Sequence, residues 1–148
     1  MLLNVLTHPN DKLRQKSQPV KAEEISSKDF KKLVKNMMET MIKKDGVGLA
    51  APQIDSRIRV IVVAVNNVPE VFINPVITRK SWRKNIMEEG CLSIPGVYKK
   101  VRRPAWISMK YLDKDCKEHK IKVGGFGARV FQHEVDHLDG ILFIDKAL

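Results

Sequence analysis

The sequence predicts an α+β fold, in which largely antiparallel β-sheets wrap around a C-terminal metal-binding helix and an N-terminal amphipathic helix packs alongside. Three observations favour it. Apolar residues recur at helical spacing in the first third of the chain, several apolar strand segments follow, and a second helical segment comes near the C-terminus. No regular strand–helix alternation is present, which argues against a parallel sheet. With 148 residues, we expect a single domain over residues 1–148.

The first helix is indicated by apolar residues three and four positions apart: Phe30, Leu33, Val34, Met37, Met38, Met41 and Ile42. This spacing predicts an amphipathic helix of about 17 residues. Ser26 or Ser27 can cap its start, and Asp45-Gly46 can end it. We expect the methionines to fill core space rather than to contact a cofactor.

The segment 46–53 is small and rich in glycine, so we do not expect it to form an ordinary packed element. The β-branched run 58–65 predicts a buried strand, and 71–77 predicts a shorter one that Pro75 interrupts. Residues 106–112 and 119–123 are predicted strands joined by a polar turn at 113–116. Gly124-Gly125 then breaks the strand pattern before the second helix.

The chain carries a net charge of +10, and the excess is concentrated between Arg79 and Lys122. That segment holds 13 Lys and Arg against five Asp and Glu. A surface of this sign attracts nucleic acid or other polyanions, but a solvated basic face explains the composition equally well. No known nucleic-acid module accompanies it, and we expect no dedicated DNA binding.

The composition also indicates the cellular compartment in which the protein works. Two cysteines, Cys91 and Cys116, are too few for a disulfide framework. No apolar run approaches the roughly 18 residues that span a membrane, and the N-terminus lacks the features of a signal peptide. We therefore expect a cytoplasmic protein without a membrane partner.

The run 132–137, Gln-His-Glu-Val-Asp-His, carries the chemistry. On a helix, His133 and His137 project from one face and can share a metal ion, and Glu134 can handle protons at a bound water. One large class of zinc proteases takes its third ligand from a later histidine, but Phe143 stands at that position. Another class takes a later glutamate, and none follows Glu134. The third ligand must come from upstream.

The upstream candidates are Cys91, Cys116, His119, His8 and various carboxylates, and two sources stand out among them. Cys91 follows Gly90, which lets the backbone approach a ligand, and precedes Leu92, whose amide is free if the strand edge is unpaired there. Alternatively, Cys116 and His119 could complete a closed structural zinc site with the two helix histidines. That site would make the protein a binding module and would leave Glu134 without a purpose. His8 lies in a polar turn and is expected at the surface.

With these residues in view, the chain resembles the peptide deformylase family. Three motifs match in order: Gly46-x-Gly48-Leu49-Ala50-Ala51-x-Gln53, Glu89-Gly90-Cys91-Leu92-Ser93, and Gln132-His133-Glu134-x-x-His137. The N-terminal segment and residues 138–143 also fit, so the resemblance covers nearly the whole chain. It implies a hydrolase that removes the formyl group from the N-terminal formylmethionine of newly synthesised proteins and releases formate.

The resemblance also implies a ligand set and a mechanism. Cys91, His133 and His137 would hold one divalent metal, with iron(II) the usual ion and nickel, cobalt or zinc as alternatives. Metal-bound water would lose a proton to Glu134, and the resulting hydroxide would attack the formyl carbon. The Leu92 N–H and the Gln53 side-chain amide would face the formyl oxygen, and donors of this kind are each typically worth about 3 kcal/mol.

For the substrate, the resemblance implies an extended peptide held in a strand-like manner along the backbone of Val47, Gly48 and Gly90. The methionine side chain would enter a pocket lined by Met87, Glu89, Phe126, Arg129 and Val130. Arg129 would contribute its aliphatic stem and keep its charge in water. A peptidase acting through the same site is the alternative enzyme.

Three departures from the family pattern stand out. Well-known bacterial members carry a long C-terminal helix that docks on the ribosome, whereas we expect this chain to lack that extension. The basic segment between Arg79 and Lys122 could supply a substitute contact to the ribosome. Tyr98 stands where some members place a substrate-binding arginine, and Cys116 replaces a turn glycine, which predicts a strained hairpin.

Overall fold

The computed structural model describes residues 1–148, except for the side chain of Val65. Short 3-10 helices lie at the start, the middle and the end of the chain: η1 (Asp11–Arg14), η2 (Ala51–Ile54) and η3 (Phe143–Lys146). The α-helices are α1 (Ala22–Ile25), α2 (Lys28–Lys43) and α3 (Gly125–Leu138). The strands are β1 (Gly48–Ala50), β2 (Val60–Val65), β3 (Val68–Lys80), β4 (Lys84–Cys91), β5 (Ile94–Pro104), β6 (Trp106–Leu112) and β7 (Glu118–Gly124).

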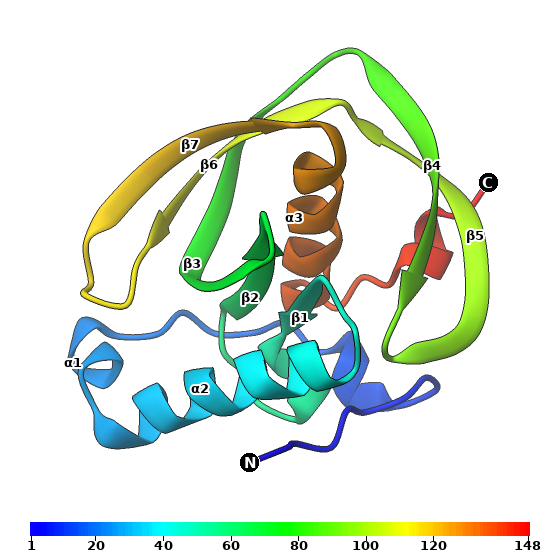
Figure 1. The fold of residues 1–148 in the computed structure, drawn as a ribbon. Helices are drawn as coiled ribbons and strands as arrows, with labels where there is room; N and C mark the ends of the chain where they lie inside the picture. The colour runs from blue at the N-terminus through cyan, green and yellow to red at the C-terminus, as the bar shows by residue number, and fades with distance from the viewer.

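The strands form two antiparallel sheets with α3 between them (Figure 1). The larger sheet has the order β1-β2-β3-β6-β7, and the smaller one is the β4–β5 hairpin. Helix α2 covers the opposite face of the larger sheet from α3. The predicted α+β fold, with antiparallel sheets around a C-terminal helix, is confirmed.

Strand β2 explains why the larger sheet can be covered on both faces. Val60 and Val62 pack in the core beneath α2, whereas Ile61 and Val63 pack in the core against α3. Because side chains alternate along a strand, a segment buried on both faces must be apolar throughout. The nearly continuous apolar run that predicted this strand is therefore a consequence of its central position.

Helix α2 begins and ends close to the predicted positions. The Ser27 hydroxyl accepts a hydrogen bond from the Phe30 N–H at 3.1 Å, as an N-cap does. Beyond the helix, Asp45 has a φ of 56°, a left-handed conformation that turns the chain away. Met37 and Met41 are fully buried, which confirms that the methionines belong to the core.

Strands β6 and β7 match the prediction, but β3 is longer than expected and runs through Pro75. The pairing with β6 shifts register between Ile73 and Val76, so the missing N–H of Pro75 falls at an irregularity of the ladder. Asn74 has a φ of 51° there, and its side-chain amide exchanges two hydrogen bonds with the backbone of Val20. The proline is accommodated rather than ending the strand.

Two parts of the sheet structure were not predicted. Residues 46–53 were expected not to pack as an ordinary element, which is wrong, because β1 is fully buried and pairs with β2. The hairpin β4–β5 was foreseen only as a short strand around Cys91. Most of its residues are exposed, so its sequence lacks the apolar alternation that reveals a strand.

Within the part of the chain that the structure describes, no helix is both long and apolar enough to cross a bilayer.

The β6–β7 turn contains a strained residue. Cys116 is exposed and has a φ of 62°, a left-handed conformation that favours glycine.

We predict that Cys116→Gly stabilises the protein by about 1 kcal/mol, because relief of the strain outweighs the added freedom of the unfolded chain. Urea unfolding with an unchanged m-value would measure it. Cys116→Ala keeps the β-carbon and serves as the control; equal stability of the two variants would contradict the prediction.

Candidate metal centre

Helix α3 brings two histidines and a carboxylate to the inside of the protein. His133 and His137 lie one turn apart, with ring centroids 5.1 Å from each other, and Glu134 follows His133 directly. All three are less than 10% exposed. Phe143, at the position where a zinc protease would carry a third histidine, stacks instead on His133 at a centroid distance of 5.9 Å.

The third donor comes from the end of β4. The Cys91 sulfur lies 3.3 Å from Nε2 of His137, and the donor atoms of Cys91, His133 and His137 all lie within 4.8 Å of one another. Metal bonds of about 2.3 Å to sulfur and about 2.0 Å to nitrogen at a tetrahedral angle would put two donors about 3.5 Å apart. The three side chains therefore fit one divalent metal and leave a fourth position open.

The rival closed zinc site is not formed. Cys116 is exposed in the β6–β7 turn, and His119 pairs with Asp113 at 2.6 Å and stacks on Tyr111. Neither residue belongs to the three-donor group of Cys91 and the helix histidines. His8 is exposed, as expected.

Glu89 fixes the orientation of the first helix histidine. Its Oε1 lies 3.0 Å from Nδ1 of His133, so the Nδ1–H donates to the carboxylate and Nε2 is left free to face a metal. Arg103 donates two further hydrogen bonds to the same carboxylate, at 2.6 and 3.0 Å. Burial would raise the pKa of Glu89, but the bonds from His133 and Arg103 outweigh burial and lower it to about 2.

Arg129 also binds this carboxylate, with its Nη1 2.5 Å from Oε2 of Glu89. The arginine is only 4% exposed; its Nη2 donates to the carbonyl and side-chain oxygens of Asn85, whereas its Nε has no partner among the described residues. The expectation that Arg129 keeps its charge in water is therefore wrong. A buried guanidinium is retained because Glu89 and the Asn85 oxygens replace its water shell.

The two histidine ligands differ in their electrostatic surroundings. Burial alone would lower the pKa of His133, but Glu134, Cys91 and Glu89 outweigh it and raise the pKa to about 10. Burial, with the positive charges of His133 and Arg103, lowers the pKa of His137 well below its ordinary value. Because a metal binds neutral imidazole, a bound metal would displace a proton from this cluster.

Glu134 is the buried acid of the site. Burial raises its pKa to about 7, against the opposing effect of the nearby positive charges of His133 and Arg103. Among the described residues, its Oε1 has no hydrogen-bond partner. The carboxyl group lies so close to β1 that a β-carbon at Gly48 would be 2.5 Å from Oε2. Only glycine at this position leaves room for the acid.

Gln53 and Leu92 border the same centre. Gln53 is 1% exposed, and its Oε1 accepts the Ala50 N–H at 2.9 Å. Its Nε2 therefore points towards the metal ligands, 3.0 Å from the Ser93 hydroxyl and 3.5 Å from the Cys91 sulfur. In the part of the chain that the structure describes, the Leu92 N–H donates to no acceptor in the β4–β5 turn. The Leu92 N–H is therefore free to donate to a further group, whereas the two Gln53 N–H groups face Ser93 and Cys91.

A cleft of about 670 Å³ opens onto the centre. Most of the predicted substrate-binding residues line it: Val47, Gly48, Glu89, Gly90, Phe126, Arg129 and Val130. Met87 does not line it, although it lies on the same strand. Tyr98 covers Gly90, where a β-carbon would be 2.6 Å from the tyrosine ring.

Sequence reasoning missed two residues of the site. Arg103 is 2% exposed and anchors Glu89, yet in the sequence it is one of a run of basic residues. Ser93 is fully buried and accepts a hydrogen bond from Gln53. No local signal distinguishes a buried arginine from the exposed Arg102 beside it, because the difference arises only when the hairpin packs on α3.

The fold and the donor set define a class of protein: an α+β chain with a cysteine–histidine–histidine centre and a buried carboxylate beside its open position, an arrangement typical of metal-dependent hydrolases. The family model described as polypeptide deformylase matches residues 2–148. The chain belongs to the polypeptide deformylase family, whose enzymes remove N-formyl groups from nascent peptides.

Individual relatives support this family membership. The peptide deformylase of Stenotrophomonas maltophilia strain R551-3 is 44% identical over 147 residues, which is 97% of this chain and 86% of the relative. The actinonin-bound class I type b peptide deformylase of Acinetobacter baumannii superposes with a TM-score of 0.95 at 39% identity, covering 100% of this chain and 99% of the other. The Thermotoga maritima peptide deformylase gives 0.95 at 36% identity, with the same coverage.

The buried carboxyl group predicts a pH effect on stability. Because the pKa of Glu134 is raised from 4.5 to about 7, the metal-free folded state keeps a proton that the unfolded state loses above pH 4.5. The contribution of Glu134 to the stability of the metal-free protein should therefore fall as pH rises from about 4.5 to 7, whereas the lowered pKa of His137 acts in the opposite direction below its ordinary value of 6.5. We predict that Glu134→Gln removes this one contribution and makes the metal-free protein more stable than wild type at pH 8 by about 3 kcal/mol.

Urea unfolding of both metal-free proteins at pH 5 and pH 8 tests this. Asp139→Asn, which changes an exposed carboxylate on the C-cap of the same helix, serves as the control and should leave the pH dependence in place. A constant stability difference between wild type and Glu134→Gln at the two pH values would contradict the prediction.

Proposed function

We propose that this chain is a metal-dependent cytoplasmic hydrolase that removes the N-formyl group from the N-terminal formylmethionine of newly synthesised proteins and releases formate. We also propose that residues 1–148 form a single catalytic domain. One observation carries the proposal: a buried carboxylate, Glu134, has an oxygen with no partner among the described residues and lies beside a three-donor metal group in an open cleft. A structural zinc site needs no such carboxylate.

Cys91, His133 and His137 would hold the metal, and we propose iron(II), with nickel, cobalt or zinc as substitutes. When bound, the metal supplies a Lewis acid for the formyl oxygen and acidifies a water molecule. The protein's contribution is to present one thiolate and two neutral imidazoles. The bond from His133 Nδ1 to Glu89 supports this role, because it fixes the tautomer that a metal ligand needs.

Glu134 would move the protons of the reaction. A water in the cleft gives a proton to its carboxylate as the water oxygen attacks the formyl carbon. The C–N bond to the methionine nitrogen then breaks, and Glu134 returns the proton to the departing amine. A pKa near 7 suits both steps at neutral pH, since the group can hold and release a proton at little cost.

Gln53 and Leu92 would stabilise the charge that develops on the formyl oxygen. The Leu92 N–H is without an acceptor among the described residues, and the Gln53 amide is held in place by its bond to Ala50. Because the Leu92 N–H is positioned before the reaction, it needs no reorganisation when the charge appears, and Gln53 would redirect its long 3.5 Å contact with the Cys91 sulfur towards the oxygen. Loss of one such donor typically costs about two to three decades in rate.

The substrate peptide would lie along the rim formed by Val47, Gly48 and Gly90, with main-chain hydrogen bonds of the strand type. We propose that the methionine side chain packs against Phe126 and Val130. Phe126 is 56% exposed, so a large apolar surface is available for it at the mouth of the cleft. We propose the ribosome as a partner, contacted through the basic segment between Arg79 and Lys122.

Formate release from a formyl-Met peptide, assayed without air and with iron, nickel or cobalt supplied, tests the activity. We predict that Cys91→Ser abolishes both turnover and stoichiometric metal, because it removes the thiolate ligand. Cys116→Ser is the matched control and should retain both, since Cys116 lies in an exposed turn. The reverse result would overturn the ligand assignment, and a wild-type protein that holds metal but releases no formate would overturn the proposed function.

Gly48 provides a second test. The β-carbon of Gly48→Ala would lie 2.5 Å from Glu134 Oε2 and 2.8 Å from its Cγ, so the carboxylate must move. We predict that kcat/KM falls about 100-fold while the metal content stays the same, because a displacement of about 1 Å costs that much when a catalytic group is misplaced.

Gly124→Ala is the control for this test, since a β-carbon there makes only ordinary contacts at 3.9 Å. Its activity should stay within a few-fold of wild type. Wild-type activity in Gly48→Ala would mean that Glu134 is not confined as proposed.

A further inference from the structure

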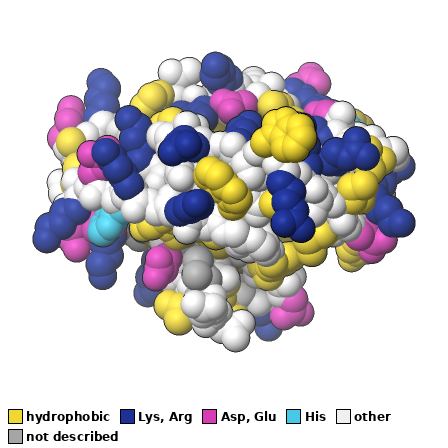
Figure 2. Space-filling view, turned by 90° about the horizontal axis from the view of Figure 1, so that it is seen from above, with side chains coloured by type: hydrophobic (Ala, Val, Ile, Leu, Met, Phe, Trp, Pro, Cys, Tyr) yellow, Lys and Arg dark blue, Asp and Glu magenta, His cyan; other side chains and the backbone are white. Residues whose placement is uncertain are grey.

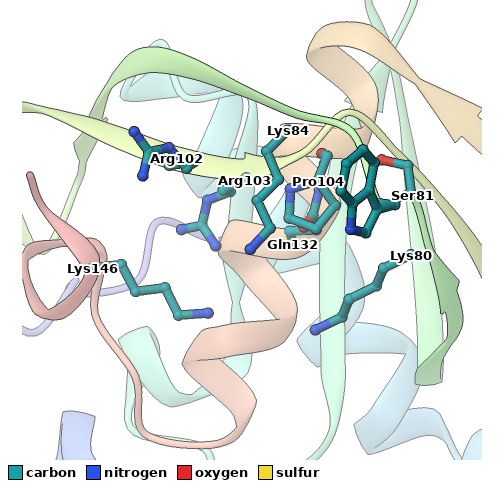
Figure 3. A pocket seen from close by; sticks show the side chains of 9 residues that line it. Lys80, Ser81, Lys84, Arg102, Arg103, Pro104, Gln132 and Lys146 are labelled. Carbon is teal, nitrogen blue, oxygen red and sulfur yellow. The ribbon is translucent and has the colours of Figure 1, made fainter.

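A second cleft, of about 660 Å³, is lined by Arg103, whose partner Glu89 lines the cleft at the metal centre. Its lining carries five positive side chains and no acidic one: Lys80, Lys84, Arg102, Arg103 and Lys146. They come from the end of β3, the start of β4, the strand β5 and the helix η3. The amino groups of Lys80, Lys84 and Lys146 point towards the same space (Figure 3).

Three of these charges are free to bind an anion. Arg103 is occupied by Glu89 and Asp136, and Lys146 shares Asp136 at 3.0 Å. Among the described residues, Lys80, Lys84 and Arg102 form no ion pair. Like charges gathered around a concavity repel one another and raise the local concentration of anions. The cleft is therefore better suited to a polyanion than to an uncharged ligand.

Trp82 stands at the edge of this cleft and is 98% exposed. It lies on a well-bonded corner between β3 and β4, because the adjacent Ser81 is buried and its hydroxyl accepts the N–H groups of Ala105 and Trp106 at 2.7 and 3.1 Å. The Ser81 hydroxyl also donates to the Arg83 carbonyl at 2.5 Å. A large aromatic ring held in water on an anchored corner offers a flat face for stacking.

We propose that this cleft binds single-stranded RNA, with phosphates on Lys80, Lys84 and Arg102 and a base stacked on Trp82. An aromatic ring beside a positively charged groove is the combination that binds single strands without reading their sequence. The choice of RNA rests on the proposed function, since nascent peptides are made on ribosomes. The cleft would then form one part of the ribosome contact that we propose for the basic segment.

The shape of the site favours a nucleic-acid strand over a lipid surface. The cations line a concavity, which admits a chain of phosphates, whereas a planar bilayer meets only protruding side chains. Figure 2 shows Lys and Arg side chains spread over the upper face of the molecule with separate hydrophobic side chains between them. This face has charges for a strand but no continuous apolar surface for membrane insertion.

Fluorescence anisotropy of a labelled ten-nucleotide uridine strand, with the metal-loaded full chain, tests the proposal. Three free cations predict a slope of about −2 for log K against log salt. Lys80→Ala with Lys84→Ala should reduce that slope by about 1.4 units.

Trp82→Ala should weaken binding about tenfold, and Trp82→Phe should restore most of it, because a stacking face is regained. RNA should quench the tryptophan fluorescence of the wild-type protein. The quenching should be absent in Trp82→Ala, where the remaining fluorescence comes from Trp106.

The control removes two lysines outside the cleft. Lys114→Ala with Lys120→Ala changes the net charge by the same amount on the β6–β7 hairpin. Equal loss of RNA binding in the two double variants would overturn the proposal, since net charge would then suffice. No binding at low salt, tighter binding of a ten-nucleotide thymidine strand, or tighter binding to phosphatidylserine vesicles would each overturn it. Formate release should be unchanged in Trp82→Ala, so failure of RNA binding and failure of deformylation are separate outcomes.

Discussion

The buried carboxylate of Glu89 is the interaction on which the centre depends. It accepts hydrogen bonds from Arg103 on β5, Arg129 on α3 and His133 on α3, so one side chain of β4 joins the hairpin to the metal-binding helix. Buried ions are costly, and removing one partner of such a cluster typically costs about 3–5 kcal/mol, since it leaves the other charges unpaired. The cluster fixes the position of the hairpin and the tautomer of a ligand at the same time.

This attachment makes the third metal ligand possible. Cys91 lies two residues after Glu89 at the end of β4, so the packing of Glu89 on α3 delivers the sulfur to the two histidines. The β1 strand closes the opposite side, where Gly48 allows the backbone to lie against Glu134. The acid is thereby confined in a dry environment, and burial raises its pKa into the range that proton transfer near neutral pH requires. Burial of the site therefore both holds Glu134 in place and sets the pKa that its reactivity requires.

The parts of the fold that could be predicted are those whose signal is local. The α2 helix shows its apolar spacing and its Ser27 cap in the sequence, and β2 shows two-sided burial as an unbroken apolar run. The hairpin β4–β5 could not be recognised, because its exposed strands lack apolar alternation. Strand β1 was missed because its residues Gly48 and Ala50 are small, which lets the strand lie close to α3. In a sequence, where that neighbouring helix is not visible, small residues indicate a loop. Arg129 was misjudged for the same reason: its partner, Glu89, is 40 residues away.

By itself, the sequence determined that two histidines and a glutamate share one helix, since residues four apart meet through local geometry alone. It also determined the family, because three motifs in order are preserved in the printed chain. Residue spacing alone left Cys91 and the Cys116–His119 pair open as the source of further ligands; the family motifs favoured Cys91, and the tertiary structure brings it to the histidines, because that contact depends on how a hairpin packs against a helix. The same packing separated Arg103, buried and paired, from Lys80, Lys84 and Arg102, which face a second cleft. Charges that are alike in sequence acquire different roles when the fold gives some of them a buried partner.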